Sequence, residues 1–237
     1  MSASFRTVLR VGAAALAFAG AAAQAVPVTA TLTADNYYGL YVGKADGSGL
    51  RFIGRNELTD VSLPGPGNAW TRPETWSFQA GAGEYAYVVV RDVGSEQMWI
   101  GDFKFGTQEI VSNRASWEFV VAPSLNAWAQ NATQPVTLTN LDGLIDAANL
   151  ANRWAAPLAE ANNGVLPWRT IAGVDTDAKF LWHDTLGRTS TSDNSFAIFR
   201  SLTPFEAQAV PEPGSLALVG LGLLAAGALR RRARAQG

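Results

Sequence analysis

Residues 85–92 read Tyr85-Ala86-Tyr87-Val88-Val89-Val90-Arg91-Asp92, and they form the clearest strand pattern in the chain. Aromatic and β-branched side chains favour extended backbone because they pack well on a pleated surface. The pair Gly94-Ser95 follows closely and predicts a turn into the next strand. The stretch therefore predicts a β-strand, followed by a turn and a further strand at residues 98–105.

The same short-strand pattern recurs on both sides of this stretch. Residues 141–160 interrupt it, because their leucines, Ile145 and Ala148 follow mixed helical spacing that predicts one or two short helices or turns. Many short strands with Gly/Pro turns indicate a sandwich or barrel. We expect one all-β domain over residues 26–207, a jelly-roll-like antiparallel β-sandwich with a short helical insertion. The other predicted strands are residues 29–33, 37–42, 50–54, 75–78, 98–105, 117–121, 169–174, 178–182 and 196–200.

Several of these segments resemble the strands of galactose-binding-like jelly-roll domains. Two departures stand out: Gly43-Lys44 replaces the usual Asn-Gly of that family, and Leu181 replaces a bulkier residue. Ligand contacts in that family vary among loops, so the resemblance implies a fold and assigns no binding residue. The matching segments are residues 33–43, 81–90, 99–103, 178–182 and 196–200.

Charge divides the 237-residue chain into a body and two basic ends. Between Val26 and Ala209 the body carries 12 basic and 19 acidic residues, a formal charge near −7. Nucleic-acid binding requires Lys and Arg that face phosphates, so an acidic body argues against a nucleic-acid partner. The chain contains no cysteine, which excludes thiol nucleophiles and thiolate metal sites.

Residues 1–25 have the parts of a secretory signal peptide. Arg6 and Arg10 provide the positive start, and residues 11–23 are an apolar stretch too short to span a bilayer comfortably. Ala23-Gln24-Ala25 is a small-x-small cleavage site. The leader has no Arg-Arg pair, so we expect export by the general secretory route. An uncleaved anchor is the alternative interpretation.

Three pieces follow one another in residues 210–237. Proline fixes its own φ and restricts its predecessor, so Pro211, Glu212 and Pro213 form a stiff, extended segment. Residues 215–229 are an uncharged run rich in Leu, Ala, Gly and Val, which predicts a short transmembrane helix. The basic stop after it stays cytoplasmic by the positive-inside rule, so the body lies outside the inner membrane. Its arginines are Arg230, Arg231, Arg232 and Arg234.

This order of Pro-Glu-Pro, short apolar helix and arginine cluster resembles the PEP-CTERM sorting signal, and an ordinary tail anchor is the alternative. The resemblance implies recognition at Pro211, Glu212 and Pro213 by an exosortase, a membrane cysteine-protease-like enzyme. It also implies a Gram-negative host that makes exopolysaccharide, transient anchoring in the inner membrane, and release to the cell surface or matrix. The tail is a sorting signal, so it indicates where the protein goes and gives no information about what the body binds.

The residues that enzymes use are scattered along the body. His183 is the single histidine, and its neighbour Asp184 points to the opposite face if the two lie on a strand, which disfavours a Ser-His-Asp device. Glycoside hydrolysis needs two facing carboxylates, and nothing in the sequence pairs the candidates. We therefore expect that the protein is not an enzyme. The carboxylate candidates are Glu84, Asp92, Asp102 and Glu118.

Two further sets of residues suggest binding. Asp175 and Asp177, with Asp184 or Asp193 nearby, offer oxygen ligands for a structural Ca²⁺, although acidic turn residues are usually just turns. Aromatic faces stack on sugars, so the tryptophans in loop-like stretches are the candidates for glycan contact, with burial as the alternative. These tryptophans are Trp70, Trp128, Trp154 and Trp168.

The leading hypothesis is a non-catalytic surface or matrix protein that binds exopolysaccharide weakly or has a structural role. A polysaccharide-acting hydrolase is the second hypothesis, and it requires a cleft with two facing carboxylates. A protein-interaction module in matrix assembly is the third. It would show an exposed apolar patch or an open sheet edge without an aromatic sugar groove.

Overall fold

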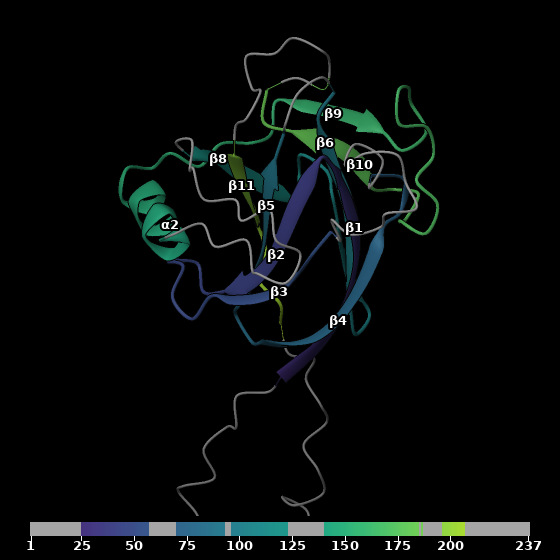
Figure 1. The fold of residues 1–237 in the computed structure, drawn as a ribbon. Helices are drawn as coiled ribbons and strands as arrows, with labels where there is room; N and C mark the ends of the chain where they lie inside the picture. The colour runs from purple at the N-terminus through teal and green to yellow at the C-terminus, as the bar shows by residue number, and fades with distance from the viewer. Residues whose placement is uncertain are drawn as a thin grey trace, which may run out of the picture. The chain divides into compact units, whose positions relative to one another are not determined.

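The predicted strand at residues 85–92 becomes β5 (Tyr85–Arg91), the central strand of a five-stranded antiparallel sheet that we call sheet B. Its order is β3-β2-β5-β11-β8 in the computed structural model (Figure 1). Each strand begins and ends within a few residues of the expected position. The bounds are β2 Tyr37–Gly43, β3 Arg51–Arg55, β8 Trp117–Ala122 and β11 Phe196–Ser201.

A second antiparallel sheet, sheet A, has the order β4-β1-β6-β10-β9, with β7 paired to β6. In the described part of the chain, the two sheets and one short helix make an all-β sandwich, as the strand pattern predicted. Successive strands repeatedly change sheet, for example from β1 to β2 and from β5 to β6. The bounds are β1 Ala25–Asp35, β4 Glu74–Gly81, β6 Met98–Phe105, β7 Gln108–Val111, β9 Ala159–Asn162 and β10 Lys179–Trp182.

The structure describes residues 25–56, 70–92, 96–122, 140–184, 186 and 196–206. Contacts divide the chain into two units, Met1–Glu206 and Ala207–Gly237, and only the first contains described residues. Almost all of the predicted signal peptide and the whole predicted sorting tail lie outside the described part. Within that part, no helix is long and apolar enough to cross a membrane.

Large aromatic rings fill the space between the sheets. Trp99 of β6 meets Trp117 of β8 edge-to-face with ring centroids 4.7 Å apart, and Phe199 of β11 lies 5.4 Å from Trp99. Edge-to-face pairs of this kind stabilise a core beyond the area that they bury. All three rings are fully buried, so the aromatic residues of the strand patterns anchor one sheet on the other.

Helix α2 (Leu141–Leu150) covers the outer face of sheet B. It buries Leu141, Ile145 and Ala148, which are spaced four and three residues apart and therefore lie on one helical face. They pack with residues such as Tyr87 and Ile198, which point away from sheet A. β5 is consequently buried on both faces, which explains why its sequence is apolar without alternation.

Residues 163–178 form a segment, which we call the covering loop, over the outer face of sheet A. Its apolar residues Trp168, Ile171 and Val174 pack on residues of β6 and β10. Covering by this loop changes the burial pattern along β1. Exposed and buried residues alternate from Ala25 to Ala30, and burial becomes continuous from Leu32 to Asp35.

The structure differs from the sequence-based expectation in three places. The predicted strand at 169–174 is wrong: these residues form turns, and their apolar side chains are there to cover sheet A. Strand β9, at 159–162, begins within the stretch expected to be helix and turns, and extends beyond it. β7 was not predicted at all, because a four-residue strand with Gln108 and Glu109 has little strand pattern.

Candidate binding site on the outer face of sheet A

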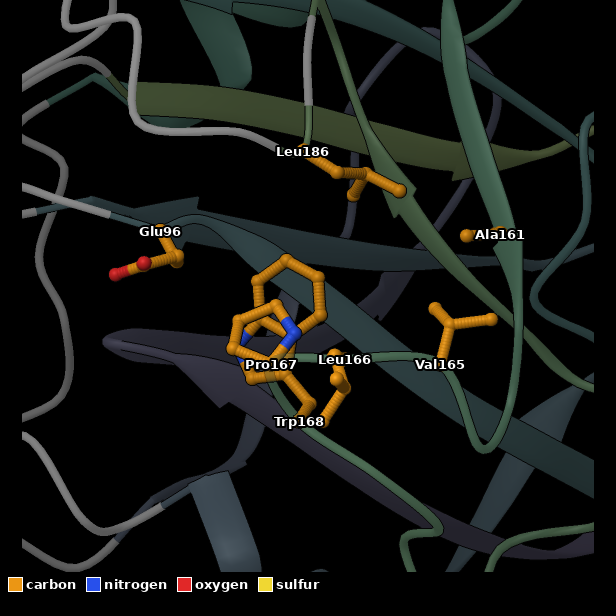
Figure 2. Close-up of a pocket in the computed structure, with 7 residues that line it drawn as sticks. All are labelled: Glu96, Ala161, Val165, Leu166, Pro167, Trp168 and Leu186. Atoms are coloured by element: carbon orange, nitrogen blue, oxygen red, sulfur yellow. The ribbon is translucent and has the colours of Figure 1, made fainter.

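The covering loop encloses one side of an apolar pocket with a volume of about 470 Å³. Figure 2 shows the rings of Pro167 and Trp168 overlapping at its centre, with Val165 and Ala161 to one side and Glu96 to the other. Leu166 and Leu186 complete the lining. Leu166 is 75% exposed, so the pocket opens to solvent beside a large apolar side chain.

Short hydrogen bonds fix the loop that carries these side chains. The N–H of Arg169 donates to the carbonyl of Val165 at 2.8 Å, and the N–H of Val165 donates to the carbonyl of Asn162 at 3.2 Å. Gly164 has a φ of 116°, which an L side chain rarely adopts, so the turn after β9 requires glycine here. The turn therefore presents Val165 to Trp168 beside the edge strand.

Trp168 forms the floor of the pocket and ties it to β1. Its ring is 2% exposed and packs on Phe180 with centroids 5.2 Å apart. Its indole N–H donates to Oδ2 of Asp35 at 2.8 Å. Trp168, which the sequence predicted as a possible sugar-stacking residue, is therefore almost fully buried.

Asp35 is a buried carboxyl behind this floor. Burial raises its pKa to about 7, the hydrogen bond from Trp168 lowers it in part, and the charges of Asp92 and Glu96 raise it further. Asp92 is fully buried at the end of β5, and Glu96 precedes β6. Asp92 and Glu96 therefore act on Asp35 at this end of the sandwich, where Asp35 keeps its proton up to about pH 7.

The structure separates the other candidate stacking residues. Trp70 is half-buried and packs on the same apolar cluster as Trp168. Trp154 is half-buried near α2 on sheet B, where the guanidinium of Arg200 lies 4.1 Å from its ring centroid. Trp128 lies outside the described residues. The tryptophans that are described thus divide between two sheets and do not line one groove.

The candidate calcium residues lie beside a lysine. Nζ of Lys104 is 3.5 Å from Asp102, 3.4 Å from Glu109 and 3.7 Å from Asp175. The N–H of Asp177 donates to Oδ1 of Asp175 at 2.9 Å, the geometry of a turn. Among the described residues, no group of three or more acidic or histidine side chains is arranged to hold a metal ion.

The candidate catalytic residues have structural partners of their own. Burial lowers the pKa of His183, whose ring packs beside Phe119 and Trp182, while Asp184 opposes that shift. Glu84 pairs with Arg51 at 2.9 Å and Glu118 with Arg200 at 2.6 Å.

Of the residues that line the pocket, the sequence predicted only Trp168; the others are Glu96, Ala161, Val165, Leu166, Pro167 and Leu186. One signal was available: Val165-Leu166-Pro167-Trp168 is an apolar run that directly follows the turn residues Asn162-Asn163-Gly164. An apolar run in a loop is unusual, because loops run over the surface.

Comparisons with known proteins identify one segment of the chain. Residues 209–232 match the PEP-CTERM protein-sorting motif. No curated protein and no solved structure matches the chain. The match includes Pro211, Glu212 and Pro213 and the first arginines of the basic stop, as the sequence predicted. This chain therefore carries a PEP-CTERM protein-sorting motif, which supports its interpretation as an exported substrate of an exosortase.

Proposed function

We propose that this protein is a non-catalytic component of the cell surface or extracellular matrix, and that its sandwich binds another matrix protein through the pocket on sheet A. The observation that carries the binding role is the open apolar pocket next to Leu166, which is 75% exposed. Exposed apolar patches in exported proteins often mark interaction sites. The sorting motif supports the location.

The chemistry of the pocket favours a protein partner over a sugar. Its lining is Ala161, Val165, Leu166, Pro167, Trp168 and Leu186, with Glu96 as the charged member. Ligand sites use a few placed polar groups to orient a polar ligand, and a sugar needs many of them. An apolar lining with an exposed leucine instead fits the side chains of a partner protein.

The location is tested by the intact mass of the protein from membrane and released fractions of host cells, with and without the exosortase. We expect a released form that ends near Pro211 to Pro213 only when the exosortase is present. A form that keeps Arg230 to Gly237 and stays in the membrane in both strains would make this an ordinary tail-anchored protein. The Gram-negative host and the general secretory route remain predictions that accompany this proposal.

The binding role is tested by retention in the matrix. We expect Leu166→Ser to wash out of the matrix more readily than the unsubstituted protein, because it removes apolar contact at the pocket. Leu150→Ser is the matched control, since Leu150 is 81% exposed and lies on α2, over the other sheet. Equal retention of all three proteins would refute binding through this pocket.

Glycan binding is the second candidate, supported by the half-buried rings of Trp70 and Trp154 and by the resemblance to galactose-binding-like jelly rolls. Under this hypothesis the protein co-sediments with host exopolysaccharide, and Trp70→Ala or Trp154→Ala reduces the co-sedimented fraction. Co-sedimentation that Leu166→Ser abolishes and both tryptophan variants preserve would instead place the sugar at the pocket.

A polysaccharide hydrolase is the third candidate, because a carboxyl with a raised pKa beside other carboxylates can act as a general acid. Asp35 has a raised pKa, but it is 8% exposed and lies behind Trp168, so this candidate also requires the covering loop to open. Release of reducing ends from host exopolysaccharide, lost in Asp35→Asn, would favour the enzyme over the binding module.

A further inference from the structure

The pocket on sheet A has an apolar end and an acidic end. Val165 and Ala161 lie on one side of the Pro167–Trp168 pair, and Glu96 lies on the other, with its carboxylate directed away from the rings (Figure 2). Among the described residues that line the pocket, Glu96 is the one that carries a charge. A ligand that fills the pocket from end to end therefore meets apolar surface first and a carboxylate at the rim.

Further negative charge lies behind the rim. Asp92 and Glu96 both act electrostatically on Asp35, so the three carboxyl groups lie close to one another. Asp35 and Asp92 are buried at 8% and 0% exposure, and burial raises the pKa of Asp35 to about 7, so Asp35 adds little negative charge below that pH. The body as a whole carries a formal charge near −7. The Glu96 carboxylate at the rim and the net negative charge of the body therefore favour a cation over a carboxylate at the pocket.

We propose that the pocket binds a lysine or arginine side chain of a partner protein, with its aliphatic stem along Leu166 and Pro167 and its cation at Glu96. This proposal rests on the proposed function and names the chemistry of the partner. Lysine and arginine suit the geometry because their long stems bury against apolar surface while their charged heads stay at the edge. A purely apolar side chain fills the pocket but brings no positive charge to Glu96.

The volume agrees with a single anchoring side chain and its neighbours. At about 470 Å³ the cavity lies toward the lower end of the range for small-ligand pockets, roughly 300–1,000 Å³. Interfaces often depend on a few such anchors that fill pockets in the partner. The basic partner segment would dock at the covering loop, beside edge strand β9.

The test measures the binding of three dye-labelled octapeptides to the protein purified as its host releases it. The peptides are identical except for a central lysine, norleucine or glutamate. We expect the lysine peptide to bind about tenfold more tightly than the norleucine peptide, and the glutamate peptide to bind most weakly. The lysine preference should shrink as salt is added, because ions screen the charge at the rim.

Variants separate the charge from the apolar contact. Glu96→Gln should remove most of the lysine preference and leave the norleucine affinity unchanged. Leu166→Ser should weaken both peptides, whereas the control Leu150→Ser should change neither. Lysine binding that is indifferent to Leu166→Ser would place the peptide elsewhere and overturn the proposal.

The outcomes also distinguish this inference from the proposed function. Equal binding of the lysine and norleucine peptides, unaffected by Glu96→Gln, would overturn the cationic anchor while leaving the pocket as an apolar docking site. If no peptide binds, the cationic anchor fails. If Leu166→Ser also stays in the matrix as firmly as the unsubstituted protein, the proposed function fails with it.

Discussion

The indole N–H of Trp168 donates a 2.8 Å hydrogen bond to Oδ2 of Asp35, a residue 133 positions earlier in the chain. The bond connects the covering loop to the last residue of β1. Burial around it leaves the carboxyl with a raised pKa, since a charge in an apolar environment loses its hydration. This one contact therefore couples the floor of the pocket to the protonation of Asp35.

The first prediction concerns pH and Asp35→Asn. The pKa of Asp35 is raised from 3.8 to about 7, so the folded state holds this proton more tightly than the unfolded chain. Its contribution to the free energy of unfolding is therefore present below about pH 4 and declines as the pH rises to about 7, by up to about 4 kcal/mol. Asparagine cannot ionise and can still accept the bond from Trp168. In urea unfolding between pH 4 and 8, the free energy of unfolding of Asp35→Asn should rise relative to that of the unsubstituted protein as the pH increases. Parallel curves would contradict the raised pKa.

The second prediction compares two arginines. Arg200 pairs with Glu118, lies over Trp154 and donates to Asn149, and its side chain is 11% exposed. Removing one partner of a buried pair leaves the other charge uncompensated, so Arg200→Met should cost about 3 kcal/mol in unfolding free energy.

Arg51→Met is the control for that substitution, because Arg51 also pairs with a glutamate, Glu84, but is 47% exposed. Exposed pairs contribute at most about 1 kcal/mol. Chemical denaturation of both variants measures the difference. Equal losses would show that Arg200 has no special role in joining α2 to sheet B.

The third prediction concerns Lys104 and calcium. Its ammonium group lies between the carboxylates of Asp102, Glu109 and Asp175. Lys104→Gln removes that positive charge and leaves oxygen ligands of the kind that Ca²⁺ prefers. We expect millimolar Ca²⁺ to raise the Tm of Lys104→Gln and to leave the unsubstituted protein unchanged. A Ca²⁺-dependent Tm in the unsubstituted protein would instead support the calcium site predicted from Asp175 and Asp177.

The fourth prediction concerns the close approach of β1 and β6. A Cβ at Gly101 would lie 2.6 Å from Cβ of Leu32 and 2.9 Å from the carbonyl oxygen of Thr31. Gly101→Ala should therefore destabilise the fold by about 1–3 kcal/mol through overpacking. At Gly81 the nearest atoms belong to the flexible side chain of Glu84, so Gly81→Ala should cost less. Thermal unfolding measures both, and similar Tm values would mean that the strands can separate without cost.

The strands of the core were predictable because their pattern is local. Aromatic and β-branched residues dominate β5 and β11, so backbone preference and burial agree there. β9 was not predictable, since Ala159 to Asn162 contains no strand-favouring residue and becomes a strand only by pairing with β10. A strand that forms only by pairing with residues distant in the sequence has no local sequence pattern from which it could be predicted.

The pocket was less predictable than the fold. Its lining comes from β9, from the covering loop and from Glu96 and Leu186, which the chain brings together only through the sheet. Trp168 illustrates the difficulty, because a tryptophan in a loop can contact a ligand or be buried, and the sequence does not distinguish the two. Here the loop folds back on the sheet and buries it.

The sandwich has a separate covering on each outer face, α2 on sheet B and the covering loop on sheet A. The two apolar clusters beneath them share no residue. Each covering is also tied to its own sheet by a hydrogen bond, the loop through Trp168 and Asp35 and α2 through Asn149 and Arg200. Because no buried apolar residue is shared between the two clusters, local opening of one covering need not open the other.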